Sequence, residues 1–256
     1  METLFSIYAA IFGCLIGSFL NVVILRLPAK KDLVSQRSGC PQCGTQLKWF
    51  HNIPIFSFIF LRGRCAFCGK RISWRYPLIE ILTGMVSFWL FPDDPNMVNM
   101  GYYVYHFIVA CVFICHFFID LDHHLLLDSL NLYLLACIFP FAIIHHPWPY
   151  WLSGGVIGFG VPLIVTWLFY KIRGQVGLGG GDIKLFGILG LILGPMGIVF
   201  NIFLSCFLGA IVGVGMIAAQ KMNKEKPIAF GPAILIVATL QIFFPELSAE
   251  LQSWFF

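Results

Sequence analysis

The sequence has few charged residues. Only 11% of its 256 residues are Asp, Glu, Lys or Arg, whereas 59% are hydrophobic. Soluble globular domains are about 45–50% apolar, so this composition excludes an ordinary soluble domain. Low-complexity linkers and repeats with a period of 20–50 residues are also lacking. We therefore expect an all-α polytopic membrane protein that contacts the lipid bilayer and has no nucleic-acid partner.

The apolar stretches predict about eight transmembrane helices. A bilayer helix needs about 20 apolar residues, with a range of roughly 17–25. The helix expected at 183–194 is too short to cross alone, so its start should lie within the membrane depth, shielded by neighbouring helices. Eight crossings would place both termini outside. The expected spans are near residues 4–25, 77–91, 102–119, 125–145, 152–170, 183–194, 197–219 and 228–245.

The first of these spans is expected to be a membrane anchor. It has neither a basic n-region nor a small-residue cleavage site, so it does not read as a signal peptide. Arg26 follows it as a stop signal.

Lys and Arg are absent from every turn on one side of the predicted bundle. All sixteen can be placed on the other side: ten between Arg26 and Arg75, then Lys171 and Arg173, Lys184, and three from Lys221 to Lys226. By the positive-inside rule that side is cytoplasmic.

This charge pattern divides the chain into three parts. We expect a first transmembrane helix over residues 1–28, a small cytoplasmic domain over residues 29–76, and a membrane core over residues 77–256. Residues 29–76, hereafter the inserted segment, are polar, basic and rich in turn-forming residues.

Four of the nine cysteines form two CxxC pairs in the inserted segment. Cys40 and Cys43 are followed, after twenty-one residues, by Cys65 and Cys68. This spacing is typical of a structural Zn²⁺ site with four thiolate ligands. Two disulfides are disfavoured in a reducing compartment, and a redox dithiol would need only one pair. A site with four Cys ligands leaves no open position for water, so the metal is expected to fold the domain.

Two clusters of acidic residues lie at the predicted cytoplasmic edge of the membrane. Asp120 and Asp122 end the third span, and Asp182 follows a run of glycines at the start of the sixth. Ionisable residues near the membrane core are functional candidates by default. Two facing carboxyl groups share one proton, so one acts as a base towards water and the other as an acid. The pair Asp120 and Asp182 is therefore a candidate for metal-free peptide hydrolysis.

Structural roles compete with this interpretation. Asp182 and Asp128 each stand where a helix N-cap is expected. Asp122 and the pair His123 and His124 read as a solvated loop. The Gly-rich run before Asp182 lacks the order of a phosphate-binding loop. It favours close approach of an extended substrate backbone instead.

With these residues in view, the chain resembles the type IV prepilin peptidase family, also called prepilin leader peptidase/N-methyltransferases. The motifs that carry the resemblance are matched in order along nearly the whole chain. One position departs, because Leu127 precedes Asp128 where the family often has proline. The matching motifs are Gly17 to Pro28, the two CxxC pairs, Asn52-Ile53-Pro54, Arg62 to Cys65, Arg75 to Glu80, Asp120, the GxGD motif Gly179 to Asp182 with Lys184, and Phe230-Gly231-Pro232.

The resemblance implies an aspartyl endopeptidase of the bacterial inner membrane. Asp120 and Asp182 would be its catalytic pair, and Gly179, Gly181, Lys184, Glu80 and Asp128 supporting residues. It implies cleavage of type IV prepilins and pseudopilins after Gly on the cytoplasmic side. It also implies N-methylation of the new terminus with S-adenosylmethionine, although no GxGxxG-type loop marks a cofactor site.

Glu80, near the same edge, is expected to pair with an arginine of the inserted segment or to meet a basic leader peptide. Two other functions remain open from the sequence. A proton-coupled transporter would have its acids spread through the bilayer depth, whereas here they cluster at one edge. A non-catalytic pilus or secretion assembly factor would use the cysteine domain to dock a partner.

Overall fold

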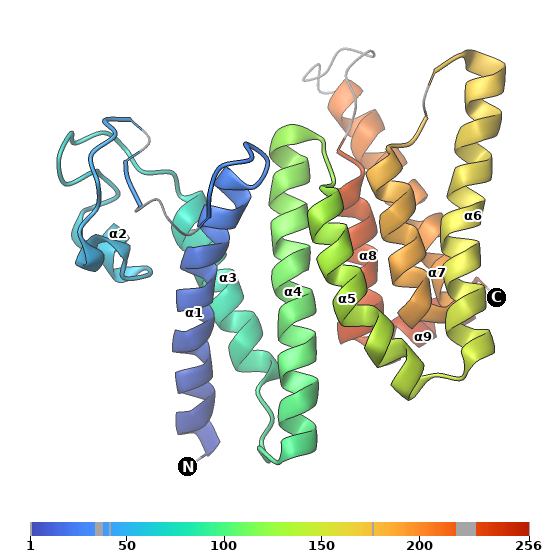
Figure 1. Ribbon diagram of the computed structural model, residues 1–256, viewed down its shortest axis with the longest axis horizontal. Helices are drawn as coiled ribbons and strands as arrows, with labels where there is room; N and C mark the ends of the chain where they lie inside the picture. Colours follow the sequence, from blue (N-terminus) through green and yellow to red (C-terminus); the bar gives the residue numbers. More distant parts are fainter. Residues whose placement is uncertain (1, 34–37, 41, 176, 219–228, 256) are drawn as a thin grey trace. The chain divides into compact units, whose positions relative to one another are not determined.

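The computed structural model describes residues 2–33, 38–40, 42–175, 177–218 and 229–255. Apart from two isolated β-bridges, the regular structure in these ranges is helical, which confirms the all-α fold class (Figure 1). The helices are α1 Glu2–Arg26, the short 3₁₀ helix η1 Trp49–Asn52, α2 Phe56–Phe60, α3 Arg75–Leu90, α4 Met97–His123, α5 Asp128–His145, α6 Trp148–Arg173, α7 Gly180–Ala218, α8 Gly231–Phe243 and α9 Pro245–Ser253.

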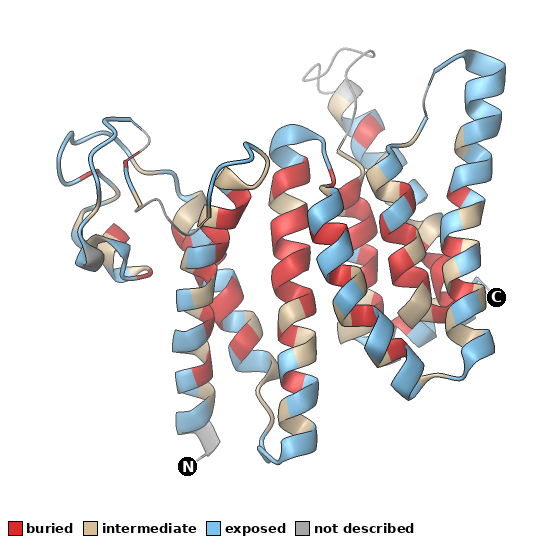
Figure 2. Ribbon diagram, viewed as in Figure 1, coloured by how far each residue is buried: buried red, intermediate tan, exposed pale blue. Residues whose placement is uncertain are grey.

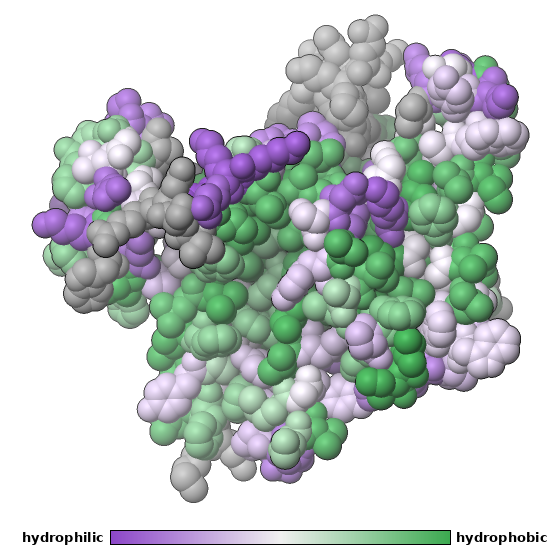
Figure 3. Space-filling model, viewed as in Figure 1, coloured by the Kyte–Doolittle hydropathy of each residue, from purple (hydrophilic) through white to green (hydrophobic). Residues whose placement is uncertain are grey.

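Several helices have the length and composition of membrane spans. Within the described ranges, α1, α4, α5, α6 and α7 qualify individually, and α8 with α9 forms a pair bent by 108° that makes up to six. The outer faces of these helices are exposed (Figure 2), and large apolar side chains cover them (Figure 3), as contact with lipid requires. A multi-pass membrane protein is thus confirmed. The number of eight crossings is not, because α3 has only 16 residues and α8 only 13.

The chain forms two compact units, Met1–Cys115 and His116–Phe256. The first contains α1, the inserted segment, α3 and most of α4. The second contains the last turns of α4 and α5 to α9. The cysteine cluster belongs to the first unit, and both candidate catalytic aspartates belong to the second.

In the first unit, α1 and α3 pack with their backbones almost in contact. Gly13 and Gly17 are spaced as in a GxxxG motif, which lets two membrane helices approach closely. A Cβ at Gly13 would lie 2.6 Å from the Cβ of Ser87, and one at Gly17 would lie 2.8 Å from the Cα of Glu80. The hydroxyl of Ser87 also donates to the carbonyl of Ala9 at 2.7 Å. These contacts fix α3 against α1 and hold Glu80 in the buried seam.

In the second unit, α7 is broken at Gly194 into two helical arms. Gly194 has φ 68° and ψ −177°, a backbone conformation that only glycine adopts readily. The hydroxyl of Tyr150 donates to the carbonyl of Leu193 at 2.9 Å, next to the break. The predicted break between residues 194 and 197 is therefore confirmed.

The two arms of α7 fold back beside each other against α8. The ring of Phe230, just before α8, lies 6.3 Å from the ring of Phe186 in the first arm. It also contacts Gly209 in the second arm. Deeper in α8, Gln241 accepts a hydrogen bond from buried Asn201 at 2.7 Å. The start of the first arm, the Asp182 end, thereby comes close to the start of α8.

Candidate functional site

Asp120 lies in the last turns of α4 and is buried, with 4% of its surface exposed. Its Oδ2 atom accepts a hydrogen bond of 2.9 Å from the N–H of Gly231, the first residue of α8. A Cβ at Gly231 would stand 2.8 Å from the same oxygen, so a side chain there would displace the carboxylate. The N-terminus of a helix carries free N–H groups and a partial positive charge, which suits a carboxylate.

Asp182 lies in the first turn of α7 and is half-buried. Its N–H donates to the carbonyl of Gly179 at 3.1 Å. A Cβ at Gly179 would lie 2.7 Å from Oδ2 of Asp182, so the glycine leaves room for this carboxylate. Because α7 begins at Gly180, Asp182 lies inside the helix, and the N-cap alternative is wrong.

The two aspartates converge although they are far apart in the sequence. Their carboxyl groups are near enough to interact electrostatically. Leu126, which is buried, links the segments that carry them. A Cβ at Gly181 would lie 2.7 Å from the Leu126 carbonyl oxygen, and one at Gly231 would lie 3.1 Å from a Leu126 methyl group. The end of α4, the start of α7 and the start of α8 thus meet at one point.

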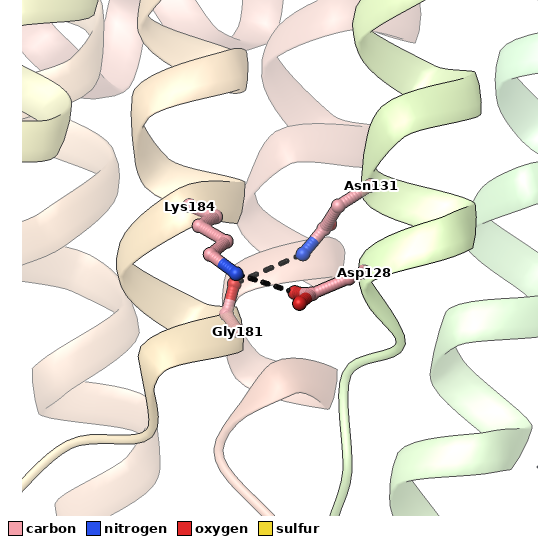
Figure 4. A network of polar contacts seen from close by, with 4 residues as sticks. All are labelled: Asp128, Asn131, Gly181 and Lys184. Atoms are coloured by element: carbon pink, nitrogen blue, oxygen red, sulfur yellow. Dashed lines mark hydrogen bonds and ion pairs between the residues drawn. The ribbon is translucent and has the colours of Figure 1, made fainter.

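The starts of α5 and α7 are joined by two polar contacts (Figure 4). Lys184 Nζ forms an ion pair of 2.7 Å with Asp128 Oδ1, and Asn131 Nδ2 donates to the carbonyl of Gly181 at 3.2 Å. The expectation that Asp128 caps α5 is wrong. Leu127 is the N-cap, and no side chain provides a capping hydrogen bond there.

Asn131 is a site residue that the sequence reasoning missed. The sequence feature that could have identified it is a single amide side chain within an apolar stretch, three residues after Asp128. Such residues in membrane helices bond across to a neighbouring helix, as Asn131 does.

The polar residues after Asp120 lie at the end of α4. The expected loop is wrong for Asp122 and His123, because α4 continues through His123. Both residues and His124 are exposed, in agreement with a solvated or interfacial role. His124 ends the helix with φ 51°, and its N–H donates to the carbonyl of Asp120 at 2.8 Å.

The four cysteines of the inserted segment converge in the first unit. Their Sγ atoms all lie within 4.8 Å of one another, and those of Cys40 and Cys68 are 3.9 Å apart. Tetrahedral Zn²⁺ with Zn–S bonds of about 2.3 Å requires sulfur atoms about 3.8 Å apart. The four residues therefore fit the donor set and the size of a closed zinc site.

The two CxxC turns are built alike. Gly44 N–H donates to the carbonyl of Cys40 at 2.9 Å, and Gly69 N–H donates to that of Cys65 at 3.0 Å. Both glycines have positive φ, 72° and 69°, which favours glycine directly after the second cysteine of each pair. Each turn is closed by a β-bridge, Gly39 to Gln46 and Arg64 to Arg71.

Hydrogen bonds in these turns favour the thiolate form of two of the four cysteines. Cys43 Sγ and the hydroxyl of Thr45 lie 3.3 Å apart, and this bond, with that of the Thr45 N–H, lowers the pKa of Cys43 to about 6. The N–H groups of Cys68 and Phe67 lower the pKa of Cys65. At Cys68 the N–H of Lys70 is outweighed by desolvation and the neighbouring thiols, which raise the pKa to about 11. Since a metal binds the deprotonated thiol, the shifts at Cys43 and Cys65 prepare these two ligands for a cation.

Glu80 ties the inserted segment to α3. Its buried carboxylate accepts a hydrogen bond of 2.8 Å from the N–H of Ile55. The sequence predicted either an arginine side chain of the inserted segment or a basic leader peptide as its partner. The structure provides a main-chain donor instead.

Comparison with known proteins places these features in a family. Residues 11–93 match the bacterial peptidase A24 N-terminal domain, and residues 107–214 match the type IV leader peptidase family. A protein of Xanthomonas campestris pv. campestris named prepilin leader peptidase/N-methyltransferase is 35% identical over 92% of this chain and 90% of its own length. Proteins of the same name from Stutzerimonas stutzeri and Pseudomonas aeruginosa are 34% and 31% identical. They cover 91% and 93% of this chain, and 88% and 90% of their own lengths.

No solved structure matches the chain. The two family matches together include α1 from residue 11 onward, both cysteine pairs and both aspartates. The relatives extend over about nine-tenths of each chain, so the similarity is not confined to one motif. This chain therefore belongs to the type IV leader peptidase family.

Proposed function

We propose that this protein is a membrane aspartyl endopeptidase and N-methyltransferase. It removes the leader of type IV prepilins and pseudopilins after Gly and then methylates the new N-terminal residue. The convergence of Asp120 and Asp182 in one unit carries the peptidase part of this proposal. The names of the relatives, prepilin leader peptidase/N-methyltransferase, support both activities.

The two carboxyl groups divide the work of hydrolysis. Two neighbouring carboxyl groups share one proton, so the charged group takes a proton from water while the neutral one protonates the peptide. Oδ2 of Asp120 already accepts the Gly231 N–H, which leaves its Oδ1 for water or for the shared proton. The attacked carbonyl then collapses and releases the amine of the mature chain.

Gly179, close to Asp182, provides space for the substrate. It is exposed, and a Cβ at this position would lie 2.7 Å from Oδ2 of Asp182. An extended peptide can therefore lie along this part of the loop, close to the carboxylate of Asp182. The Lys184–Asp128 ion pair and the hydrogen bond from Asn131 to Gly181 fix the position of the loop while the substrate binds.

Two cofactors follow from the proposal. Cys40, Cys43, Cys65 and Cys68 hold a structural Zn²⁺ that folds the inserted segment. S-adenosylmethionine supplies the methyl group for transfer to the new amine.

The basic residues orient the protein in the bacterial inner membrane. Their concentration between Arg26 and Arg75 supports a cytoplasmic position for the inserted segment, and Lys171, Arg173 and Lys184 support the same side for the aspartates. In this arrangement residues 1–28 are the first membrane helix, residues 29–76 the metal-binding domain associated with methylation, and residues 77–256 the peptidase core. A prepilin offers its cleavage site at the same boundary, between a basic leader and an apolar helix.

Mass spectrometry of the products tests both activities at once. The purified full-length protein is reconstituted in liposomes with a synthetic prepilin, with and without S-adenosylmethionine. We expect shortening of the substrate in both samples and addition of a methyl group only with the donor. Proton-dependent solute uptake without any shortening would instead support a transporter.

A further inference from the structure

The inserted segment carries an apolar surface that the described residues of the first unit leave uncovered. We define the α2 face as Phe50, Ile53, Phe56, Ile59 and Phe60. All five side chains are exposed, Phe56 by 73% and Phe60 by 88%, and they line a hollow of about 390 Å³. Contiguous exposed apolar surface of this kind marks an interaction site.

The exposure of these side chains follows from how α2 packs. Phe58 is its buried residue, and its ring lies 4.7 Å from that of Trp74 and covers Gly63. Because Phe58 packs on the inner side of this short helix, the side chains of Phe56, Ile59 and Phe60 point away from the inserted segment. The α2 face is therefore a fixed feature of the folded segment.

The hydrogen bond between Ile55 and Glu80, hereafter the tether, sets the height of α2 along α3. Ile55, directly before α2, donates its N–H to Glu80, five residues after the start of α3. At 1.5 Å per residue, that point lies about 7.5 Å along α3 from its first residue. Figure 1 shows α2 level with the first turns of α3. Glu80 packs against Gly17 of α1, which has the length and composition of a membrane span, so the α2 face lies level with a segment of that span.

The backbone is strained at Ile55, the residue that donates the hydrogen bond of the tether. Ile55 has φ 63° and ψ −52°, an outlier for a β-branched residue, and Phe56 N–H donates back to the Pro54 carbonyl. Such a conformation persists only where its surroundings impose it. Proline on one side and the buried Glu80 carboxylate on the other impose it here, so the height of α2 is closely defined.

Charge decides what can cover the α2 face. Between Arg26 and Arg75 the sequence has ten basic residues and a single acid, Asp32. Lys48 and Arg62 border the face and are exposed, and the ammonium of Lys48 lies 5.8 Å from the ring of Phe50. Apolar side chains beside Lys and Arg are the pattern of an element that inserts into an anionic lipid surface. A cationic partner would be repelled.

We propose that the α2 face inserts into the boundary between the headgroups and acyl chains of the bilayer. Phe56, Ile59 and Phe60 enter the acyl region, and Lys48 and Arg62 bind anionic headgroups. This contact holds α2 at the membrane surface. It does not depend on the proposed catalytic activity.

Photocrosslinking to lipid tests the proposal on the full-length protein in nanodiscs. Benzoylphenylalanine replaces Phe60 or, as the control, Gln46, an exposed residue of the first cysteine turn. Burial of one Phe side chain favours the inserted state by about tenfold or more, so the adduct with lipid at position 60 should exceed that at 46 about tenfold. Replacing neutral lipids by anionic ones should increase it further. A crosslink to a second copy of the chain, or equal lipid labelling at both positions, overturns the proposal.

A second variant tests the proposal without a probe in α2, so that it holds even where benzoylphenylalanine at residue 60 disturbs this helix. Phe56, Ile59 and Phe60 are replaced together by serine, and trypsin cleavage after Arg62 is followed in neutral and anionic nanodiscs. In the unaltered protein, cleavage should be about tenfold slower in anionic nanodiscs, because insertion shields this residue. The serine variant should be cleaved equally fast in both. Lipid-dependent protection that survives the three substitutions contradicts membrane insertion of the α2 face.

Discussion

Replacing Gly181 by alanine should disable cleavage while leaving the protein inserted and folded. A methyl group at residue 181 would stand 2.7 Å from the Leu126 carbonyl oxygen and 2.8 Å from the Leu126 Cβ. Ordinary contacts begin at 3.4 Å, so the backbone on one side has to move by about 0.7 Å. Neither obstacle is the flexible end of a side chain. The start of α7, with Asp182 directly after Gly181, must therefore shift away from the segment between α4 and α5.

Two opposing contributions determine how much the Gly181→Ala substitution changes stability. Overpacking of this kind costs about 1–3 kcal/mol. Alanine in a helix offsets about 0.5–1 kcal/mol of that cost relative to glycine. The net loss of stability is small, but a misplacement of about 1 Å in an active site can reduce the rate about a hundredfold. We expect the cleavage rate to fall about tenfold to a hundredfold.

Gly180→Ala is the matched control, because it adds the same methyl group one residue earlier. A Cβ at Gly180 meets nothing within 4 Å, so this variant should cleave at the rate of the unaltered protein. The initial rate of leader removal from a synthetic prepilin is measured for both variants in liposomes, with thermal unfolding as the check on folding. Equal rates for Gly181→Ala and Gly180→Ala would refute the reasoning.

Three further predictions concern the ion pair and the cysteine cluster. In a double-mutant cycle of Asp128→Asn and Lys184→Gln, thermal unfolding should give a coupling free energy of about 0.2–1 kcal/mol, because both side chains are well exposed. A coupling free energy of zero would show that the ion pair does not contribute to stability. Thr45→Val removes the hydroxyl that lowers the pKa of Cys43, so competition with a chelator should show metal affinity reduced about 10- to 100-fold at neutral pH, and unchanged affinity contradicts this role. Cys40→Ser should unfold the inserted segment and reduce methylation more than cleavage, both measured by product mass, whereas equal loss of both activities would contradict the separation.

Much of the site could be predicted from the sequence because its residue types are costly in a membrane. Asp120 and Asp182 stand out because carboxyl groups are rare at the edge of an apolar helix. The cysteine cluster was predictable because two CxxC pairs can close around one ion whatever the intervening chain does. The break at Gly194 was visible as a glycine and proline between two apolar stretches.

The partners of the polar residues were not predictable, because they depend on tertiary packing. Asp128 looked like a helix cap, yet it pairs with Lys184, 56 residues away. Glu80 was expected to bind an arginine, and its partner is a main-chain N–H. Local spacing indicates which residues need a partner but not which distant residue provides it.

The number of membrane crossings was also beyond the sequence. Hydropathy counts apolar stretches, and it cannot distinguish one span from a helix pair bent by 108°, as α8 and α9 are. The short helices α3 and α8 are apolar enough to have been counted as spans, but their lengths of 16 and 13 residues fall below the roughly 17–25 that a crossing requires.

The most direct test of the central claim is the cleavage rate of single aspartate variants. Asp120→Asn and Asp182→Asn keep the size of each side chain but remove its ability to exchange a proton. Each should reduce the rate by at least about a hundredfold, while Asp122→Asn, an exposed position in the same turn of α4, should have no effect. If the Asp120 and Asp182 variants both trim the prepilin at the rate of the Asp122 variant, these two aspartates do not form the catalytic pair.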